Sequence, residues 1–149
     1  MAEFTLTNFE FRKGIYTGTQ AEMINGNGDL LAPDSGMVFA NPSFTLRNLS
    51  KNSYDVQNAV SMSVDYNDGF LYTMDDHSSY ITHDGGIWTR YASGGGRGQI
   101  PTLSPLLTKE YEYFISILDL IETDTDSPLR LIVYLPSQTG TVEFVYRMR

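Results

Sequence analysis

Cysteine is absent from the 149 residues, and basic residues are scarce: 10 Lys and Arg stand against 18 Asp and Glu, a formal net charge of −8. The lack of cysteine excludes disulfides, thiol catalysis and thiolate-bound zinc. The acidic balance argues against nucleic acid, because duplex binding depends on Lys and Arg that neutralise phosphates, and it disfavours anionic membrane surfaces for the same reason. We therefore expect no nucleic acid and no membrane among the partners.

Long apolar runs are missing as well. No stretch approaches the roughly 18 apolar residues that would span a bilayer. Residues 1–10 lack both the basic segment and the apolar run of a secretory signal. We therefore expect the protein in the cytoplasm or, if it is viral, in the virion.

Aromatic residues are plentiful: the chain has ten Tyr, eight Phe and one Trp. Apolar and polar residues alternate in many segments, most clearly over 59–66, where Val60, Met62, Val64 and Tyr66 share one face. Alternation of this kind is typical of antiparallel strands with one buried face, and aromatic residues favour strands. The sequence predicts an all-β fold, an antiparallel β-sandwich or jelly roll of about eight to ten strands.

Turn residues separate the predicted strands between 56 and 92. Residues 67–69, Asn-Asp-Gly, and residues 84–86, Asp-Gly-Gly, carry the chemistry of tight hairpins, which need positive φ. The interpretation that follows is a run of four consecutive antiparallel strands over 56–92.

Two other segments have distinctive patterns. The apolar positions change parity from Phe4 and Leu6 to Phe9 and Phe11, which predicts a bulge or a bend in an N-terminal strand. Residues 129–135 are apolar at nearly every position, which predicts a central strand.

The length of the chain suits a single domain spanning 1–149. Residues 93–105 contain the segment Ser-Gly-Gly-Gly-Arg-Gly and two prolines, and we interpret them as a flexible connection inside that domain. Residues 106–121 fit both a strand and a helical period. Their aromatic and β-branched residues favour a strand.

The sequence contains few of the residues and motifs that catalysis uses. The chain has two histidines, and no G-x-S-x-G, H-E-x-x-H or phosphate-loop motif. We expect no enzymatic activity and no cofactor. Two segments are candidates for metal binding: Glu122, Asp124 and Asp126 alternate as Ca²⁺ ligands do, and residues 25–29 have a similar alternation. Both segments also fit ordinary turns.

Aromatic residues and aspartates are interleaved over 65–91. Carboxylates beside aromatic rings suit a sugar, whose C–H faces stack on rings while its hydroxyls donate to Asp; aromatic residues are also enriched at protein interfaces. The alternative is that these residues fill the core and the turns. The candidate residues for a ligand or an interface are Tyr66, Tyr72, Asp76, Tyr80, Trp88 and Tyr91.

The composition also favours association with other proteins. Seven Arg stand against three Lys, and Arg and Tyr are enriched at protein interfaces, where Lys is depleted. We expect a homo-oligomer or a larger assembly, and most specifically a virion component such as a phage capsid decoration, tail or baseplate protein. A carbohydrate-binding module is the alternative. The expected contact residues are Arg97, Ile100, Leu103 and the end strands around Phe4 and Phe144.

Overall fold

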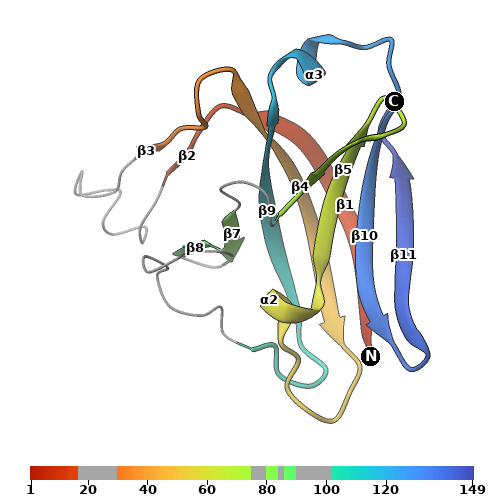
Figure 1. Ribbon diagram of the computed structural model, residues 1–149. Coiled ribbons are helices and arrows are strands. Elements are labelled where there is room, and N and C mark those ends of the chain that lie inside the picture. The colour runs from red at the N-terminus through yellow and green to blue at the C-terminus, as the bar shows by residue number, and fades with distance from the viewer. Residues whose placement is uncertain (17–29, 75–79, 84–85, 90–101) are drawn as a thin grey trace.

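The computed structural model describes residues 1–16, 30–74, 80–83, 86–89 and 102–149, and these form a β-sandwich (Figure 1). Within the described residues, five strands form one antiparallel sheet and four strands form the other. The expected all-β sandwich is confirmed.

Two sheets, a separate pair of short strands and two short helices make up the described fold. The five-stranded sheet contains, in spatial order, β1 (Ala2–Arg12), β4 (Met37–Asn48), β9 (Thr108–Leu118), β7 (Tyr80–His83) and β8 (Gly86–Thr89). The four-stranded sheet contains β11 (Gly140–Arg147), β10 (Leu129–Ser137), β5 (Ser61–Tyr66) and β6 (Phe70–Thr73). The remaining elements are the pair β2 (Ile15–Tyr16) and β3 (Leu30–Leu31) and two helices of four residues, α2 (Val56–Ala59) and α3 (Leu120–Thr123).

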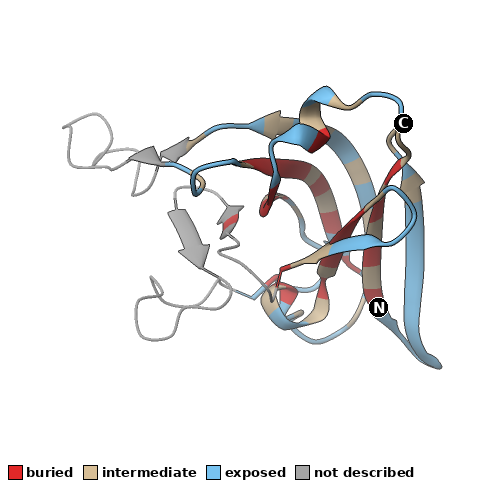
Figure 2. Cartoon of the chain, turned by 45° about the horizontal axis from the view of Figure 1, so that its top comes forward, coloured by how far each residue is buried: buried red, intermediate tan, exposed pale blue. Residues whose placement is uncertain are grey.

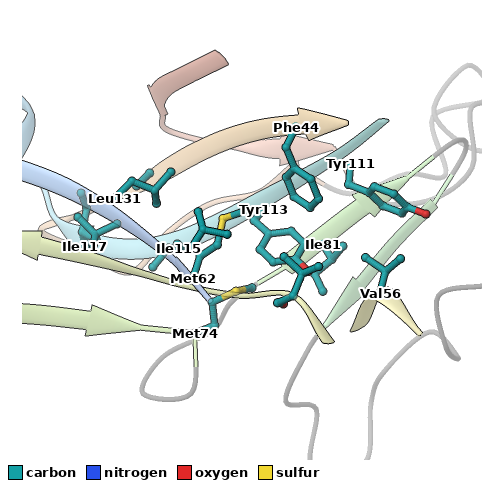
Figure 3. Packing of buried hydrophobic residues seen from close by; sticks show 14 of the residues in the cluster. Phe44, Val56, Met62, Met74, Ile81, Tyr111, Tyr113, Ile115, Ile117 and Leu131 are labelled. Atoms are coloured by element: carbon teal, nitrogen blue, oxygen red, sulfur yellow. The ribbon is translucent and has the colours of Figure 1, made fainter. Parts of the chain in front are cut away.

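The core lies between the inner faces of the two sheets. Strands β4 and β9 supply its aromatic residues: the ring of Phe44 lies 5.6 Å from that of Tyr111 and 5.1 Å from that of Tyr113, centroid to centroid. The four-stranded sheet supplies smaller side chains to the same core, such as Met62 and Leu131 (Figure 3). The hydroxyl of Tyr113 donates to the backbone oxygen of Val60 at 2.9 Å, so this buried polar group is satisfied.

The bulge predicted in the N-terminal strand is present. The register of β1 on β4 shifts between Leu6 and Asn8. The extra residue returns Phe9 and Phe11 to the face that Phe4 and Leu6 occupy, and all four side chains pack against the core.

The strand predicted at 129–135 is central, as expected, because β10 pairs with β11 on one side and with β5 on the other. Residues 106–121 also follow the favoured prediction, since β9 takes up 108–118 and the short helix α3 comes after it.

The prediction of four consecutive strands over 56–92 is wrong in its pairing. Residues 56–59 form helix α2, and the two hairpins that follow belong to different sheets: β5 pairs with β6, whereas β7 pairs with β8 and β9. Alternation has the same period of two in either sheet, so it does not indicate which sheet a hairpin joins. The turn at 67–69 does have the predicted geometry, with φ of 52° at Asn67 and 51° at Asp68.

The predicted connection at 93–105 lies outside the described residues up to position 101. In the part of the chain that is described, no helix is long and apolar enough to cross a membrane.

Candidate functional site

Strand β11 carries apolar side chains that face the other sheet and are nevertheless exposed. Val142 pairs with Leu135 and Phe144 with Val133, and both of these β10 residues lie in the core. Opposed residues of antiparallel strands point to the same face, so Val142 and Phe144 point inward. They are still 38% and 42% exposed. In Figure 2 most of β11 is coloured as exposed, beside the buried residues of β10.

Strand β1 forms the matching edge of the other sheet. Ala2, Phe4 and Leu6 oppose buried residues of β4 or lie on the same face as them, and each stays only partly buried. The ring of Phe4 lies 6.4 Å from that of Tyr146 on β11, so the two edge strands lie on the same side of the sandwich. We call the inner-face residues of these two edges the open seam: Ala2, Phe4, Leu6, Val142, Phe144 and Tyr146.

A groove of about 350 Å³ lies at one end of the open seam. Its walls come from Met1 and Ala2, from Tyr54 and from the β10–β11 hairpin, including Val142 and Phe144. Burial raises the pKa of Tyr54, so its hydroxyl stays neutral at physiological pH. The groove suits apolar or aromatic groups.

The outer face of β11 carries charge. Glu143 and Arg147 lie two positions on either side of Val145, which is 54% exposed. Arg147 opposes Arg130 of β10, and like charges directly opposed destabilise a sheet.

Acidic residues neutralise the charge of one of these two arginines, Arg130. Arg130 is paired with Asp65, and its Nη2 lies 3.6 Å from Oδ1 of Asp68. The carboxylate of Asp65 raises the pKa of Arg130 further. Within the described residues, neither Arg147 nor Glu143 has an ion-pair partner. In the part of the chain that is described, Arg147 therefore lies beside a positive charge without an ion pair of its own.

The residues of the predicted aromatic surface lie in two different sheets. Tyr66 and Tyr72 are on β5 and β6, and both are partly buried against the core. Tyr80 and Trp88 are on β7 and β8 in the other sheet, and their side chains lie outside the described residues. Asp76, Tyr91, Arg97 and Ile100 lie outside the described residues altogether. The fold therefore does not bring the six predicted residues onto one sheet.

Leu103 was expected at a contact surface and is instead fully buried in the core. Its backbone N and O each bond to Tyr54 at 2.9 Å. The expectation that Leu103 contacts another molecule is wrong because the chain forms an isolated bridge to Tyr54 there and turns the leucine inward.

The predicted metal ligands meet other partners in their own turn. Asp124 ends helix α3: its Oδ1 accepts from the backbone N of Asp126 at 3.1 Å and of Ser127 at 3.3 Å, and its Oδ2 accepts from the hydroxyl of Tyr66. The bond from Tyr66, followed by those from Ser127 and Asp126, lowers the pKa of Asp124 to about 2. In the described ranges no three acidic or histidine side chains are grouped as metal ligands, so Glu122, Asp124 and Asp126 do not come together as a set.

The sequence indicated part of the open seam. Phe4 and Phe144 were expected contact residues, and both lie in it. Val142, which is exposed, and Tyr146, which is partly buried, were missed, although their alternation with polar neighbours was visible. The opposite charges at 143 and 147, equally spaced about Val145, were the signal in the sequence that could have singled out β11.

Comparison with protein-family models and with curated protein sequences gives no match. Two solved structures share the fold. One is an uncharacterized β-sandwich protein from Clostridium difficile 630, with 20% identity, coverage of 99% of this chain and 85% of that chain, and a TM-score of 0.67. The other is a conserved hypothetical protein from Bacillus anthracis, with 13% identity, coverage of 99% and 87%, and a TM-score of 0.56. The chain is thus similar to bacterial β-sandwich proteins in fold.

Proposed function

We propose that this protein is a non-enzymatic structural protein that acts by associating with further copies of itself. The observation that carries the proposal is the open seam, where inner-face apolar side chains are exposed at Val142 and Phe144 of β11 and only partly buried on β1. Moving apolar surface out of water is favourable by about 25 cal/mol per Å². A contiguous exposed apolar surface commonly marks a protein interface.

The seam has the chemistry of a protein contact. Phe4, Phe144 and Tyr146 supply rigid aromatic area, which is enriched at interfaces. The adjoining groove, at about 350 Å³, has room for side chains of a neighbouring molecule. The charged residues Glu143 and Arg147 border the apolar strip, as polar rims do around interface cores.

The narrower form of the proposal is a virion component, a phage capsid decoration, tail or baseplate protein. Its support is compositional, namely seven Arg against three Lys together with ten Tyr. Mass spectrometry of virus particles purified from the source tests it. Detection of the chain in intact particles supports this form, and its absence from particles restricts the proposal to an assembly outside viruses.

The experiment that tests self-association is light scattering behind a sizing column, at two protein concentrations and with and without EDTA. We expect a mass above 16.7 kDa that rises with concentration. A strict monomer in every sample would contradict the proposal. A mass that changes with EDTA would instead implicate a metal ion in the association.

A second candidate function is carbohydrate binding, favoured by one observation at the β5–β6 turn. Phe70 is 61% exposed, and its ring lies 6.2 Å from that of Tyr66. An exposed aromatic ring suits stacking on the C–H face of a sugar. Binding on a glycan array that disappears in Phe70→Ala and persists in Leu107→Ala, another exposed apolar residue, would support this function; an array without binding would count against it.

A further inference from the structure

The edge strands of the sandwich differ in how well they are protected against pairing with another chain. Natural edge strands are protected by shortness, bulges, proline or lysine. β6 and β8 have four residues each, and β1 carries a bulge after Leu6. β11 has eight residues, contains no proline or lysine, and pairs with β10 without a register shift. Among the described strands, β11 is therefore the edge most open to pairing.

The hydrogen bonds of β10 show which backbone groups of β11 point outward. The N–H of Met148 donates to the oxygen of Leu129 at 2.8 Å, so Met148 bonds to β10. Bonded and non-bonded positions alternate along an antiparallel strand. The even-numbered residues of β11 therefore turn their backbone groups to β10. Thr141, Glu143, Val145 and Arg147 direct theirs to the open edge.

The hydrogen bonding between β10 and its other neighbour, β5, leads to the same assignment. The N–H of Asn67 donates to the oxygen of Pro128 at 2.9 Å. Even-numbered residues of β10 thus bond towards β5, and odd-numbered residues bond towards β11. The hydrogen bonds on both sides of β10 therefore agree: the backbone groups of the four odd-numbered β11 residues point away from β10.

From these observations we infer that two copies of the chain pair β11 with β11 in antiparallel orientation, about a two-fold axis at Val145. The inference rests on the proposed function and names the surface that would carry it. The pairing joins the two four-stranded sheets into one continuous sheet of eight strands. A two-fold contact uses the same surface on both copies, so every favourable pair occurs twice.

Charge complementarity selects this register. With Val145 on the axis, Glu143 opposes Arg147 of the second copy, and Arg147 opposes Glu143 of that copy. Each Arg147 then gains a carboxylate on the side away from Arg130. A register centred on Glu143 places two carboxylates opposite each other, which is destabilising. A register centred on Phe144 opposes Glu143 to Val145 and leaves both charges unpaired.

The inner face is self-complementary in the same register. Phe144 opposes Tyr146 of the second copy, and Val142 opposes Met148 of the second copy. Aromatic cross-strand pairs stabilise a sheet. These contacts lie beside the groove, whose wall includes Val142 and Phe144. The pairing therefore covers the exposed apolar side chains of β11 and neutralises its charges at once.

Because the chain has no cysteine, a single substitution supplies a unique thiol for testing the register. In Val145→Cys the two α-carbons would lie about 5.5 Å apart across the axis, within the range of a disulfide. In the control Val142→Cys the two thiols would lie about six residues apart, roughly 20 Å at 3.3 Å per residue. We expect mild oxidation to link Val145→Cys into a covalent dimer and to leave Val142→Cys unlinked.

Charge reversal provides the second test. Glu143→Arg alone and Arg147→Glu alone each create two like-charged pairs, so we expect the dissociation constant to rise about tenfold or more. The double variant restores opposite charges and should associate within about threefold of the unchanged protein. Circular dichroism of each variant checks that the fold is intact.

The outcomes separate this inference from the proposed function. A chain that stays monomeric at all concentrations overturns both. A chain that associates while Val145→Cys does not cross-link, or while charge reversal has no effect, overturns the β11 pairing and leaves self-association standing. Cross-linking at Val145 together with rescue in the double variant supports the pairing.

Discussion

β10 and β11 are the two arms of one hairpin, and both place apolar side chains at every second position facing the other sheet. In β10 the inward side chains Leu131 and Val133 are 0% exposed, whereas Val142 and Phe144 of β11 are 38% and 42% exposed. The arms differ in their neighbours: among the described strands, β10 has one on each side, and β11 has one only on the β10 side. Alternation determines where a side chain points, and neighbouring strands determine whether it is covered.

The same contrast explains why β11 is the functional candidate and β10 is not. Covered apolar residues stabilise the fold of one chain, while exposed ones at an edge gain free energy only when another surface meets them. Substitutions at covered positions should therefore change the stability of the single chain, whereas substitutions at uncovered edge positions should change association.

The largest expected effect compares two phenylalanines. Phe44 is 0% exposed in the core and Phe144 is 42% exposed in the open seam. Phe44→Ala should lower the free energy of unfolding by about 3–5 kcal/mol, and Phe144→Ala by about 1 kcal/mol. Urea denaturation at concentrations where the chain is monomeric measures both. Equal losses in the free energy of unfolding would mean that Phe144 is as well covered as Phe44. They would contradict the contrast between covered and uncovered residues.

Tyr113 and Tyr146 allow the same comparison of core and seam for polar groups. The buried hydroxyl of Tyr113 donates to the oxygen of Val60, and Tyr113→Phe leaves that carbonyl without this donor. We expect a loss of about 1–3 kcal/mol in the free energy of unfolding. Tyr146 in the open seam has no hydrogen bond from its hydroxyl within the described residues, so Tyr146→Phe should change stability by less than about 0.5 kcal/mol. A comparable loss in both variants would contradict this account.

The third effect concerns the dependence of stability on concentration. If association covers β11, a tenfold rise in protein concentration stabilises a dimer by about 1.4 kcal/mol and raises the thermal midpoint. Phe144→Ala should weaken that dependence. Phe70→Ala removes a ring that is 61% exposed on a different edge strand and should leave it intact. Scanning calorimetry at two concentrations checks both, and a midpoint that is independent of concentration in the unchanged chain would contradict the prediction.

Local patterns predicted the local features of this fold. The parity change before Phe9 indicated the bulge, and the residues Asn67 and Asp68 indicated positive φ at the β5–β6 turn. Both depend on a few consecutive residues, so the sequence contains what is needed. The assignment of the two hairpins to different sheets depends on contacts between distant segments, and alternation does not distinguish the sheets.

The candidate site was predicted in part for a similar reason. Phe144 was expected at a contact surface and is exposed, whereas Leu103 was expected there and is buried. Both are apolar residues near the ends of predicted elements. Their difference lies in what covers them: Leu103 bonds to Tyr54 and enters the core, while the strand of Phe144 lies at the edge of its sheet among the strands that the structure describes. Coverage follows from the tertiary arrangement, which a single sequence pattern does not specify.

The smallest expected effect concerns an exposed turn away from the seam. Hydrogen bonds from Tyr66, Ser127 and Asp126 lower the pKa of Asp124 from its ordinary value of 3.8 to about 2. A lowered carboxylate pKa contributes stability that is present above the unfolded-state pKa and is lost as the pH falls through the folded-state pKa.

Asp124→Asn should therefore lower the thermal midpoint at neutral pH by a few degrees, because a neutral amide oxygen accepts weaker bonds from these donors than a carboxylate does. The difference from the unchanged chain should narrow as the pH falls below 3.8 and close only below the folded-state pKa of about 2. Asp126→Asn is the matched control: within the described residues the side chain of Asp126 accepts no hydrogen bond, so its substitution should leave the midpoint unchanged. Thermal unfolding of the three proteins across this pH range measures the effect. A gap between Asp124→Asn and the unchanged chain that persisted at about pH 1, below both pKa values, would mean that the charge of Asp124 is not what its hydrogen bonds stabilise, and that the side chain acts through its shape alone.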